Sequence, residues 1–379
     1  MEYFFVPGRL RALSWVELNC VCKSILGSQY TLVEKEQFFH LKTNVDITFV
    51  ESIFQKLGGF LKYGVFLDSD INFTQLCENE KVVFGISSYS SKYKIGEIKK
   101  LSKKLKNEFV TLGRKVRFVL PQDDLSLSTS QILNNKLLEN GFEMVLVNER
   151  MGKTLGIQDI EGFSLRDYSK PFVNSEMGVL PIKLCRMMIN IAGIKQGECL
   201  WDPFCGTGNV LLEGLDLGYD VLGSDIDKKS LDGSKKNLQW AIKKFGYKNR
   251  VQVFFLDILN PTISKLDIVQ NSNLGGIVCE PYMGKPQKRV LDEHKAKSLV
   301  KQHYSLVQHL FESFEMLNLK KKIKVVVIFP EYKTKNGWVS IEKKLLNFKN
   351  TNLIEKDLHW SRKNSIIKRL IFVFEYKAK

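Results

Sequence analysis

The stretch LWDPFCGTGNVLLEG, residues 200–214, decides the fold class of this chain. Apolar residues run up to Asp202, a turn containing two glycines follows, and a helical pattern comes next. Gly206 and Gly208 leave room for a ligand to approach the backbone at a helix start, where free N–H groups gather. We therefore predict a ligand-binding turn between a strand and a helix.

The sequence around this turn alternates short apolar, β-rich runs with helical ones from about residue 190 to the end. That alternation is typical of a parallel sheet with crossover helices, so we predict a Rossmann-like α/β domain. No helix-length apolar pattern precedes the last strand, IIKRLIFVFEY, and we expect it to pair antiparallel at the end of the sheet. The other expected strands are ECLWDPF, DVLGSDI, VQVFFLDI, GGIVCEP and IKVVVIFP.

The details of the turn select among its possible ligands. It holds no G-K-[ST], which excludes a nucleotide triphosphate loop, and a dinucleotide fingerprint would need glycine where Leu211 stands. What remains is a turn that holds S-adenosylmethionine, with the carboxylate of Asp202 near the methionyl amino end. We therefore predict S-adenosylmethionine as the cofactor.

Two further strand ends carry acidic residues that suit this cofactor. Asp225 follows Asp202 by 23 residues, about the spacing at which a carboxylate accepts both ribose hydroxyls of an adenosine. Asp227 is expected to cap a helix or to be exposed. Asp257 ends the third strand, where it can accept from the adenine amino group. Ligands of such sheets bind beyond the carboxyl ends of the strands, where all these residues lie.

With these motifs in order, the chain resembles the THUMP-domain RNA methyltransferases, nearest to the tRNA guanosine N2-methyltransferases that act at position 10. The resemblance rests on DPFCGTG at 202–208, on MGVLPIKLCRMMINIAG at 177–193, and on the later SDID and EPYMG. It implies a class I S-adenosylmethionine-dependent methyltransferase domain that methylates the N2 atom of a tRNA guanine. The cofactor-binding residues are then Asp202, Phe204, Cys205, Gly206, Gly208, Asp225 and Asp257.

The resemblance also implies a domain order for the whole chain. We expect a ferredoxin-like α+β module over 1–70, a THUMP RNA-binding domain over 71–158, a linker over 159–176 and the Rossmann-like methyltransferase domain over 177–379. In the THUMP segment, the sequence predicts strands at KVVFGISSY, RKVRFVLP and FEMVLVN and a helix from Ser128 to Asn140. In the first module it predicts a helix from Ser14 to Leu26 and three strands.

The stretch IVCEPYMGKP, residues 277–286, is the candidate methyl-transfer loop. Enzymes that methylate amino groups commonly use (D/N)-P-P-(Y/F), and Pro281 and Tyr282 match its second half. If one residue has been lost, Glu280 accepts the amino hydrogens and Tyr282 stacks on a base turned out of its helix. If none has been lost, Cys279 takes the acceptor position and Glu280 replaces proline. We favour the first alignment and predict Glu280, Pro281 and Tyr282 as the catalytic residues.

The composition favours a polyanionic partner. Lys and Arg number 57 against 41 Asp and Glu, which leaves a net charge of +16. Lysines crowd one surface of the predicted helix IGEIKKLSKKLKNEFVTLG, so a phosphate-contacting stripe is an alternative to a merely solvated face. The predicted RNA-binding residues are Lys99, Lys100, Lys103, Lys104, Arg114, Lys115 and Arg117. Lys285, Lys288 and Arg289, just past the Pro-Tyr motif, are further candidates for phosphate contacts.

Other classes find little support in the sequence. No apolar run approaches the roughly 18 residues that cross a bilayer, and the seven cysteines include no C-x-x-C pair. We expect a cytoplasmic monomer that binds tRNA, without membrane or metal, with a small activator subunit as an open question. Two alternatives stay open: an amino-methyltransferase acting on DNA adenine or another RNA, and an RNA-binding protein whose catalytic half is vestigial.

Overall fold

The computed structural model describes residues 1–68, 71–90, 92–122, 124–147, 150–173, 178–287, 289–317 and 319–378, with the side chain of residue 73 also left aside. Lys288 therefore lies outside the described residues. The chain divides into two compact units. One unit comprises residues 1–55 and 59–159, and the other comprises residues 56–58 and 160–379.

The first unit is built on one eight-stranded sheet with the order β2-β3-β1-β4-β8-β7-β5-β6. The strands are β1 Glu2–Pro7, β2 Tyr30–Glu34, β3 Phe39–Thr43, β4 Phe60–Phe66, β5 Lys81–Ser88, β6 Lys115–Val119, β7 Gly141–Val147 and β8 Arg150–Ile157. Strand β5 is parallel to β6 and β7, whereas β4 pairs antiparallel with β8. The predicted ferredoxin-like and THUMP modules thus share one continuous sheet through the β4–β8 pair.

Strand β8 was not among the predicted elements, although it joins the two halves of this sheet. It is half-polar in sequence, RMGKTLGI, and two glycines weaken its strand signal. The glycines are required by packing, because a Cβ on Gly152 would lie 2.6 Å from the ring of Phe4. Strand β2 and helix α2 were likewise not predicted.

Helices cover this sheet, and one of them corrects a prediction. They are α1 Arg11–Leu26, α2 Ile47–Lys56, α3 Ile95–Thr111, α4 Thr129–Asn134 and α5 Leu137–Asn140, with a 3-10 turn η1 at Phe73–Leu76. The single helix predicted from Ser128 to Asn140 is wrong, because the chain breaks at Lys136, whose φ of 51° is left-handed. Ser128 does form the predicted capping box with Gln131.

The second unit contains the predicted Rossmann-like sheet, in the order β11-β10-β9-β12-β13-β16-β15. Its strands are β9 Cys199–Asp202, β10 Asp220–Asp225, β11 Val251–Phe255, β12 Leu274–Cys279, β13 Ile323–Thr334, β14 Gly337–Val339, β15 Thr351–Trp360 and β16 Ile367–Tyr376. The strands β9 to β13 of the main path are parallel, and β16 pairs antiparallel with β13 and β15. The antiparallel pairing of the last strand is therefore confirmed, with β15 rather than β16 at the edge.

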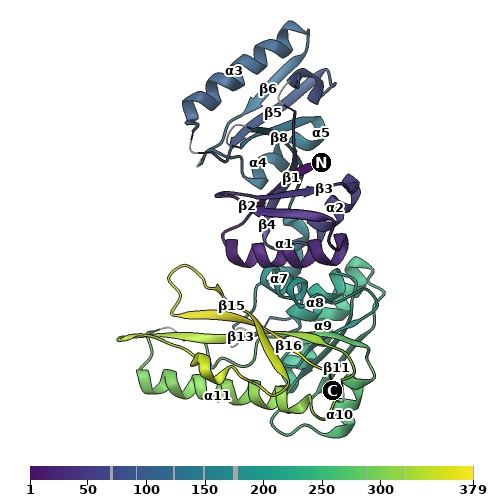
Figure 1. The fold of residues 1–379 in the computed structure, drawn as a ribbon, viewed down its shortest axis with the longest axis vertical. Helices are drawn as coiled ribbons and strands as arrows, with labels where there is room; N and C mark the ends of the chain where they lie inside the picture. The colour runs from purple at the N-terminus through teal and green to yellow at the C-terminus, as the bar shows by residue number, and fades with distance from the viewer. Residues whose placement is uncertain are drawn as a thin grey trace. The chain divides into compact units, whose positions relative to one another are not determined.

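The helices of the second unit are α6 Ile160–Tyr168, α7 Ile182–Ala192, α8 Asn209–Asp216, α9 Lys228–Phe245, α10 Ile263–Gln270 and α11 Glu293–Ser313, with a 3-10 turn η2 at Lys343–Leu345. Helix α6 lies in the segment predicted as a linker. It belongs to this unit, because Arg166 of α6 is buried and pairs with Glu213 of α8 at 2.6 Å. Figure 1 shows α11 in green beside the yellow C-terminal strands.

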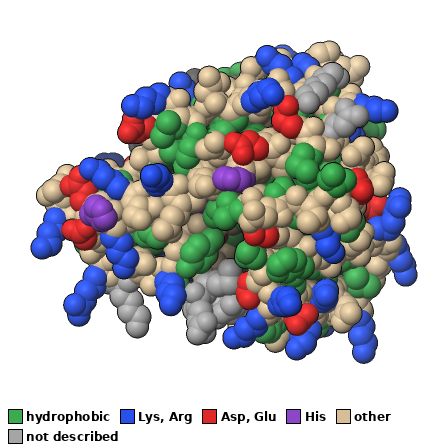
Figure 2. Space-filling model, turned by 90° about the horizontal axis from the view of Figure 1, so that it is seen from below, with side chains coloured by type: hydrophobic (Ala, Val, Ile, Leu, Met, Phe, Trp, Pro, Cys, Tyr) green, Lys and Arg blue, Asp and Glu red, His purple; other side chains and the backbone are tan. Residues whose placement is uncertain are grey.

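The surface carries many cations. Figure 2 shows lysine and arginine side chains at many points of the face that it presents, with hydrophobic side chains between them. Among the described residues, no helix is both long and apolar enough to cross a membrane.

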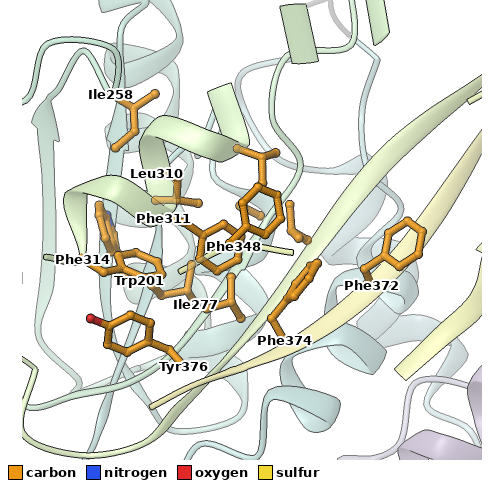
Figure 3. Packing of buried hydrophobic residues seen from close by; sticks show 14 of the residues in the cluster. Trp201, Ile258, Ile277, Leu310, Phe311, Phe314, Phe348, Phe372, Phe374 and Tyr376 are labelled. Atoms are coloured by element: carbon orange, nitrogen blue, oxygen red, sulfur yellow. The ribbon is translucent and has the colours of Figure 1, made fainter. Parts of the chain in front are cut away.

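The core of the second unit lies between the sheet and α11. Phe311 of α11 stacks on Phe348 with ring centroids 4.3 Å apart and meets the edge of Phe374 at 5.2 Å (Figure 3). Trp201 of β9 belongs to the same cluster, whereas its neighbour Leu200 faces α8. Each buried aromatic ring contributes about 1.5–3 kcal/mol, and together they hold the strand ends that carry the candidate site.

Candidate functional site

The glycine loop, residues 203–208, joins β9 to α8 in the predicted way. Gly206 and Gly208 have φ values of 50° and 87°, which other residues adopt only with strain. A Cβ on Gly208 would also lie 2.5 Å from the Oγ atom of Ser234 in α9. Both glycines are therefore required by the backbone path.

Asp225 supports this loop from the end of β10. Its Oδ2 atom accepts a hydrogen bond from the amide of Gly206 at 2.8 Å, and its Oδ1 atom accepts from the amide of Asp227 at 2.9 Å. Asp227 caps α9 by accepting from the amide of Ser230 at 3.0 Å, as predicted. Asp225 thus lies beside the glycine loop, within the region where a ribose ligand was expected.

Asp202 is the last residue of β9 and is buried, with only 2% of its surface exposed. Its Oδ1 atom accepts from the amide of Phe204 at 3.0 Å. Burial raises the pKa of Asp202 well above its usual range, and the nearby charges of Asp225 and Glu280 raise it further. A site that gathers three carboxylates in this way favours a cationic ligand.

A pocket of about 250 Å³ opens between the glycine loop and the Pro-Tyr loop, residues 280–287. It brings together residues from three separate parts of the sheet. Among its lining residues are Asp202, Phe204, Cys205 and Gly206 from the first loop, Glu280, Pro281, Tyr282 and Lys285 from the second, and Arg362, Ser365 and Arg369 from the β15–β16 hairpin. Four predicted cofactor residues and all three predicted catalytic residues therefore meet in one pocket.

Three predicted cofactor residues do not line this pocket: Gly208, Asp225 and Asp257. Asp257 accepts from the amide of Leu259 at 3.0 Å and from the side-chain amide of Asn260 at 3.1 Å. Both of its oxygens are thus used within its own turn. Its predicted contact with an adenine amino group stays a prediction.

The structure distinguishes the two alignments of the Pro-Tyr motif. Cys279 is the last residue of β12, is fully buried and does not line the pocket. Glu280 follows the strand and lines the pocket, and Tyr282 beside it is 53% exposed. Of the two candidate acceptors in this motif, Glu280 is the one that lines the pocket.

Arg369 of β16 is the partner of Glu280, and the sequence analysis missed it. Its Nε donates to Oε1 of Glu280, and its Nη2 donates to Oε2 at 3.3 Å. The one signal in the sequence is that Arg369 follows Lys368, which places two basic residues at the start of an otherwise apolar strand. No local pattern connects it to a glutamate 89 residues earlier.

Two more buried side chains hold the Pro-Tyr loop. The hydroxyl of Tyr332 in β13 donates to the carbonyl oxygen of Met283 at 2.5 Å. His303 of α11 lies with Nε2 2.8 Å from the carbonyl oxygen of Ile328 and Nδ1 3.3 Å from that of Tyr282. Burial lowers the pKa of His303 to about 4, so the imidazole is neutral near pH 7. The sequence analysis assigned no role to either residue.

The predicted RNA-binding residues fall into two groups. Lys99, Lys100, Lys103 and Lys104 of α3 are exposed, as are Lys115 and Arg117 of β6. Arg114, in contrast, is half-buried and donates to the carbonyl oxygens of Thr74 and Cys77. Its guanidinium is therefore occupied in holding the fold, whereas the lysines of α3 are available to a partner.

No group of three or more His, Cys, Asp or Glu side chains that could hold a metal ion is found among the described residues. Three carboxylates beside a glycine loop fit a ligand that carries a sulfonium, an ammonium and ribose hydroxyls.

Comparison with known proteins agrees with this geometry. Residues 173–313 match the family UPF0020, described as an RMKL-like methyltransferase domain. This part of the chain is thus similar to a methyltransferase domain. Its fold is that of the class I S-adenosylmethionine-dependent methyltransferases, as predicted.

Parts of the chain are similar in sequence to tRNA (guanine-10-N2) methyltransferases. One region is 39% identical over 98 residues to the tRNA (guanine(10)-N2)-dimethyltransferase of Methanothermobacter thermautotrophicus. Another is 34% identical over 104 residues to the tRNA (guanine(10)-N(2))-methyltransferase of Saccharomyces cerevisiae. These regions cover 25% and 27% of this chain and only 29% and 23% of the two relatives.

Two solved structures resemble the chain over nearly its whole length. TrmN from Thermus thermophilus matches with a TM-score of 0.53 and covers 99% of this chain and 100% of its own, at 13% identity. A possible methylase from Clostridium difficile 630 matches with a TM-score of 0.51 and covers 100% of this chain and 99% of its own, at 15% identity. At such identities the likeness concerns the fold alone.

Proposed function

We propose that this protein is an S-adenosylmethionine-dependent tRNA (guanine-N2)-methyltransferase that acts at guanosine 10 and forms N2-methyl- or N2,N2-dimethylguanosine. The observation that carries the proposal is the single pocket in which Asp202 of the glycine loop and Glu280 of the Pro-Tyr loop both take part. The names of the two relatives described above supply the target nucleotide.

The cofactor, when bound, supplies a methyl group on a positively charged sulfur. Asp202, the glycine loop and Asp225 are the residues that would hold it. The charges of Asp225 and Glu280 add to the effect of burial in raising the pKa of Asp202, and a bound cation would oppose that rise, which supports this assignment. Asp257 is proposed as a further contact to the adenine.

The residues of the Pro-Tyr loop bind and orient the substrate base. An exocyclic amino group is a poor nucleophile because its lone pair is delocalised into the ring. Glu280 and loop carbonyl oxygens accept hydrogen bonds from the N–H groups of this amino group, so that the lone pair becomes localised on the nitrogen. The exposed ring of Tyr282 is available to stack on a guanine that has been turned out of its helix.

The first unit is proposed to bind the tRNA as a ferredoxin-like and THUMP module. The exposed lysines of α3, with Lys115 and Arg117, support this role because they can contact phosphates. We leave Arg114 out of the proposed contact set, because backbone carbonyls already occupy its guanidinium. A cytoplasmic location, a monomeric state and an activator subunit remain open to experiment.

The test is mass spectrometry of nucleosides from tRNA transcripts that have been incubated with the full chain and labelled S-adenosylmethionine. We expect labelled N2-methyl- or N2,N2-dimethylguanosine, and none from a transcript with adenosine at position 10. Asp202→Ala and Glu280→Ala should lower transfer strongly, whereas Glu331→Ala, which breaks the ion pair with Lys368, serves as the control. Label in N6-methyladenosine, or tRNA binding without any cofactor binding, would favour one of the two alternatives instead.

A further inference from the structure

The Arg369–Glu280 pair has a geometry suited to fixing the orientation of a carboxylate. Two adjacent nitrogens of the guanidinium donate to the two oxygens of the carboxylate, which is a bidentate arrangement. Only 11% of the Arg369 side chain and 13% of the Glu280 side chain are exposed. Both residues line the pocket.

Arg369 is itself held in place. It lies opposite Trp360 in the β15–β16 ladder, and the central carbon of its guanidinium lies 4.9 Å from the centre of the Trp360 ring. Stacking on an aromatic face restricts the plane of an arginine side chain. The guanidinium is thus fixed before any substrate arrives.

We propose that Arg369 is a positioning residue for methyl transfer, which keeps Glu280 ionised and directs its remaining lone pairs at the reacting amino group. This inference rests on the proposed function of the pocket. A protonated carboxyl group is a hydrogen-bond donor, as is the amino group of the substrate. Two donors that face each other form no hydrogen bond, so the protonated form is a poor acceptor for the amino group. An ionised carboxylate only accepts, and Arg369 uses about two of its four lone pairs.

The surroundings of Glu280 make such a partner necessary. Burial raises the pKa of Glu280, and Arg369 opposes that rise. Among the described residues, four more ionisable groups interact electrostatically with this carboxylate: Asp202 from β9, Tyr332 from β13, Cys185 from α7 and Cys279 from β12. None of the four is a cation. Lys285 and Arg362 also line the pocket, but Arg369 is the cation that lowers the pKa of Glu280 among the described residues, so its removal leaves the effect of burial unopposed.

The first experiment measures the rate of methyl transfer to tRNA between pH 6 and 9 for the full chain and four variants. Arg369→Met should lose transfer at pH 6–7 by roughly tenfold for each unit by which the pKa of Glu280 exceeds the assay pH, and should recover as pH rises. Arg369→Lys should rescue most of this loss. Glu280→Gln/Arg369→Met should be slow at every pH, because no carboxyl group remains to titrate. Lys368→Met removes the neighbouring cation, which pairs with Glu331, and should behave as wild type.

A second measurement does not depend on activity. The carboxyl ¹³C resonance of Glu280, assigned by its absence in Glu280→Gln, should stay at its ionised position from pH 6 to 9 in wild type and should titrate within that range in Arg369→Met. An unchanged resonance in Arg369→Met, or a rate profile parallel to that of wild type, would overturn the role of Arg369. If the resonance shifts as expected while wild type transfers no methyl group to tRNA, the ionisation argument stands and the proposed function fails.

Discussion

The hydroxyl of Tyr332 donates a hydrogen bond to the carbonyl oxygen of Met283, and it thereby ties the loop that carries Glu280 to the central strand β13. Tyr332 is fully buried, so its bond is shielded from water. The buried imidazole of His303 lies between the carbonyl oxygens of Tyr282 and Ile328, at 3.3 Å and 2.8 Å, and its single N–H donates to one of the two. The hydrogen bond from Tyr332 thus fixes the backbone on which the proposed acceptor and stacking residues lie.

Tyr332→Phe should slow methyl transfer more than it destabilises the protein. It removes the donor and leaves a carbonyl unsatisfied, at a cost of about 1–3 kcal/mol that falls mainly on the loop. We expect transfer to fall by roughly five- to a hundredfold, since 1.4 kcal/mol corresponds to a factor of ten. Steady-state rates of methyl transfer to tRNA measure this loss. The matched control is Tyr304→Phe, because the ring of Tyr304 stacks on Phe348. Equal rates for both variants would contradict the role of Tyr332.

The stability of the protein should depend on pH through His303. Its pKa is lowered from 6.5 to about 4 in the folded protein, so the unfolded chain binds the extra proton first as pH falls. Stability from this group is fully present above pH 6.5 and is lost as pH falls from 6.5 to 4, by about 3 kcal/mol in all. Urea unfolding across this range measures the slope. The dependence of the unfolding free energy on pH should become weaker in His303→Gln. It should persist in His309→Gln, which changes another histidine of the same helix. An unchanged dependence in His303→Gln would refute the assignment.

Asp225→Ala should weaken cofactor binding. The change removes the acceptor that holds the amide of Gly206 and the proposed acceptor of the ribose hydroxyls. We expect the affinity for S-adenosylhomocysteine to fall at least about tenfold, which is 1.4 kcal/mol, in isothermal titration calorimetry. Asp227→Ala, two residues away, removes only the cap of α9 and should cost about 1 kcal/mol of stability with little change in affinity. A similar loss of affinity in both variants would show that the effect is one of folding.

Lys62→Met should destabilise the first unit strongly. Lys62 and Glu143 are 1% and 0% exposed, and Nζ of Lys62 lies 2.6 Å from Oε1 of Glu143. Removal of the cation leaves a buried carboxylate unpaired, which costs about 3–5 kcal/mol. Hydrogen exchange of peptides from β4 and β7 should report this loss. Lys42→Met removes an exposed partner of Glu2 in the same sheet and should change exchange by less than about 1 kcal/mol. Protection in Lys62→Met equal to that of the control would contradict the prediction.

Local sequence patterns predicted most of the methyltransferase domain because each rests on short-range physics. Apolar runs that end at Asp202 and Asp225 can bury as parallel strands, and glycine alone turns the chain at Gly206 and Gly208 without strain. The elements that escaped prediction have weak or mixed patterns. Strand β8 contains two glycines, and the predicted helix from Ser128 to Asn140 gives no local signal of the left-handed turn at Lys136.

The sequence by itself therefore determined the class of fold, the order of the strands along the chain and the residue types at their carboxyl ends. Only the tertiary structure decided which of Cys279 and Glu280 faces the pocket, because the strand end sets which side chain points out of the sheet. It alone brought Arg369 to Glu280. Arg369 lies on β16 and Glu280 directly after β12, and β13 separates these two strands. Their contact depends on an antiparallel register that no pattern within either segment encodes.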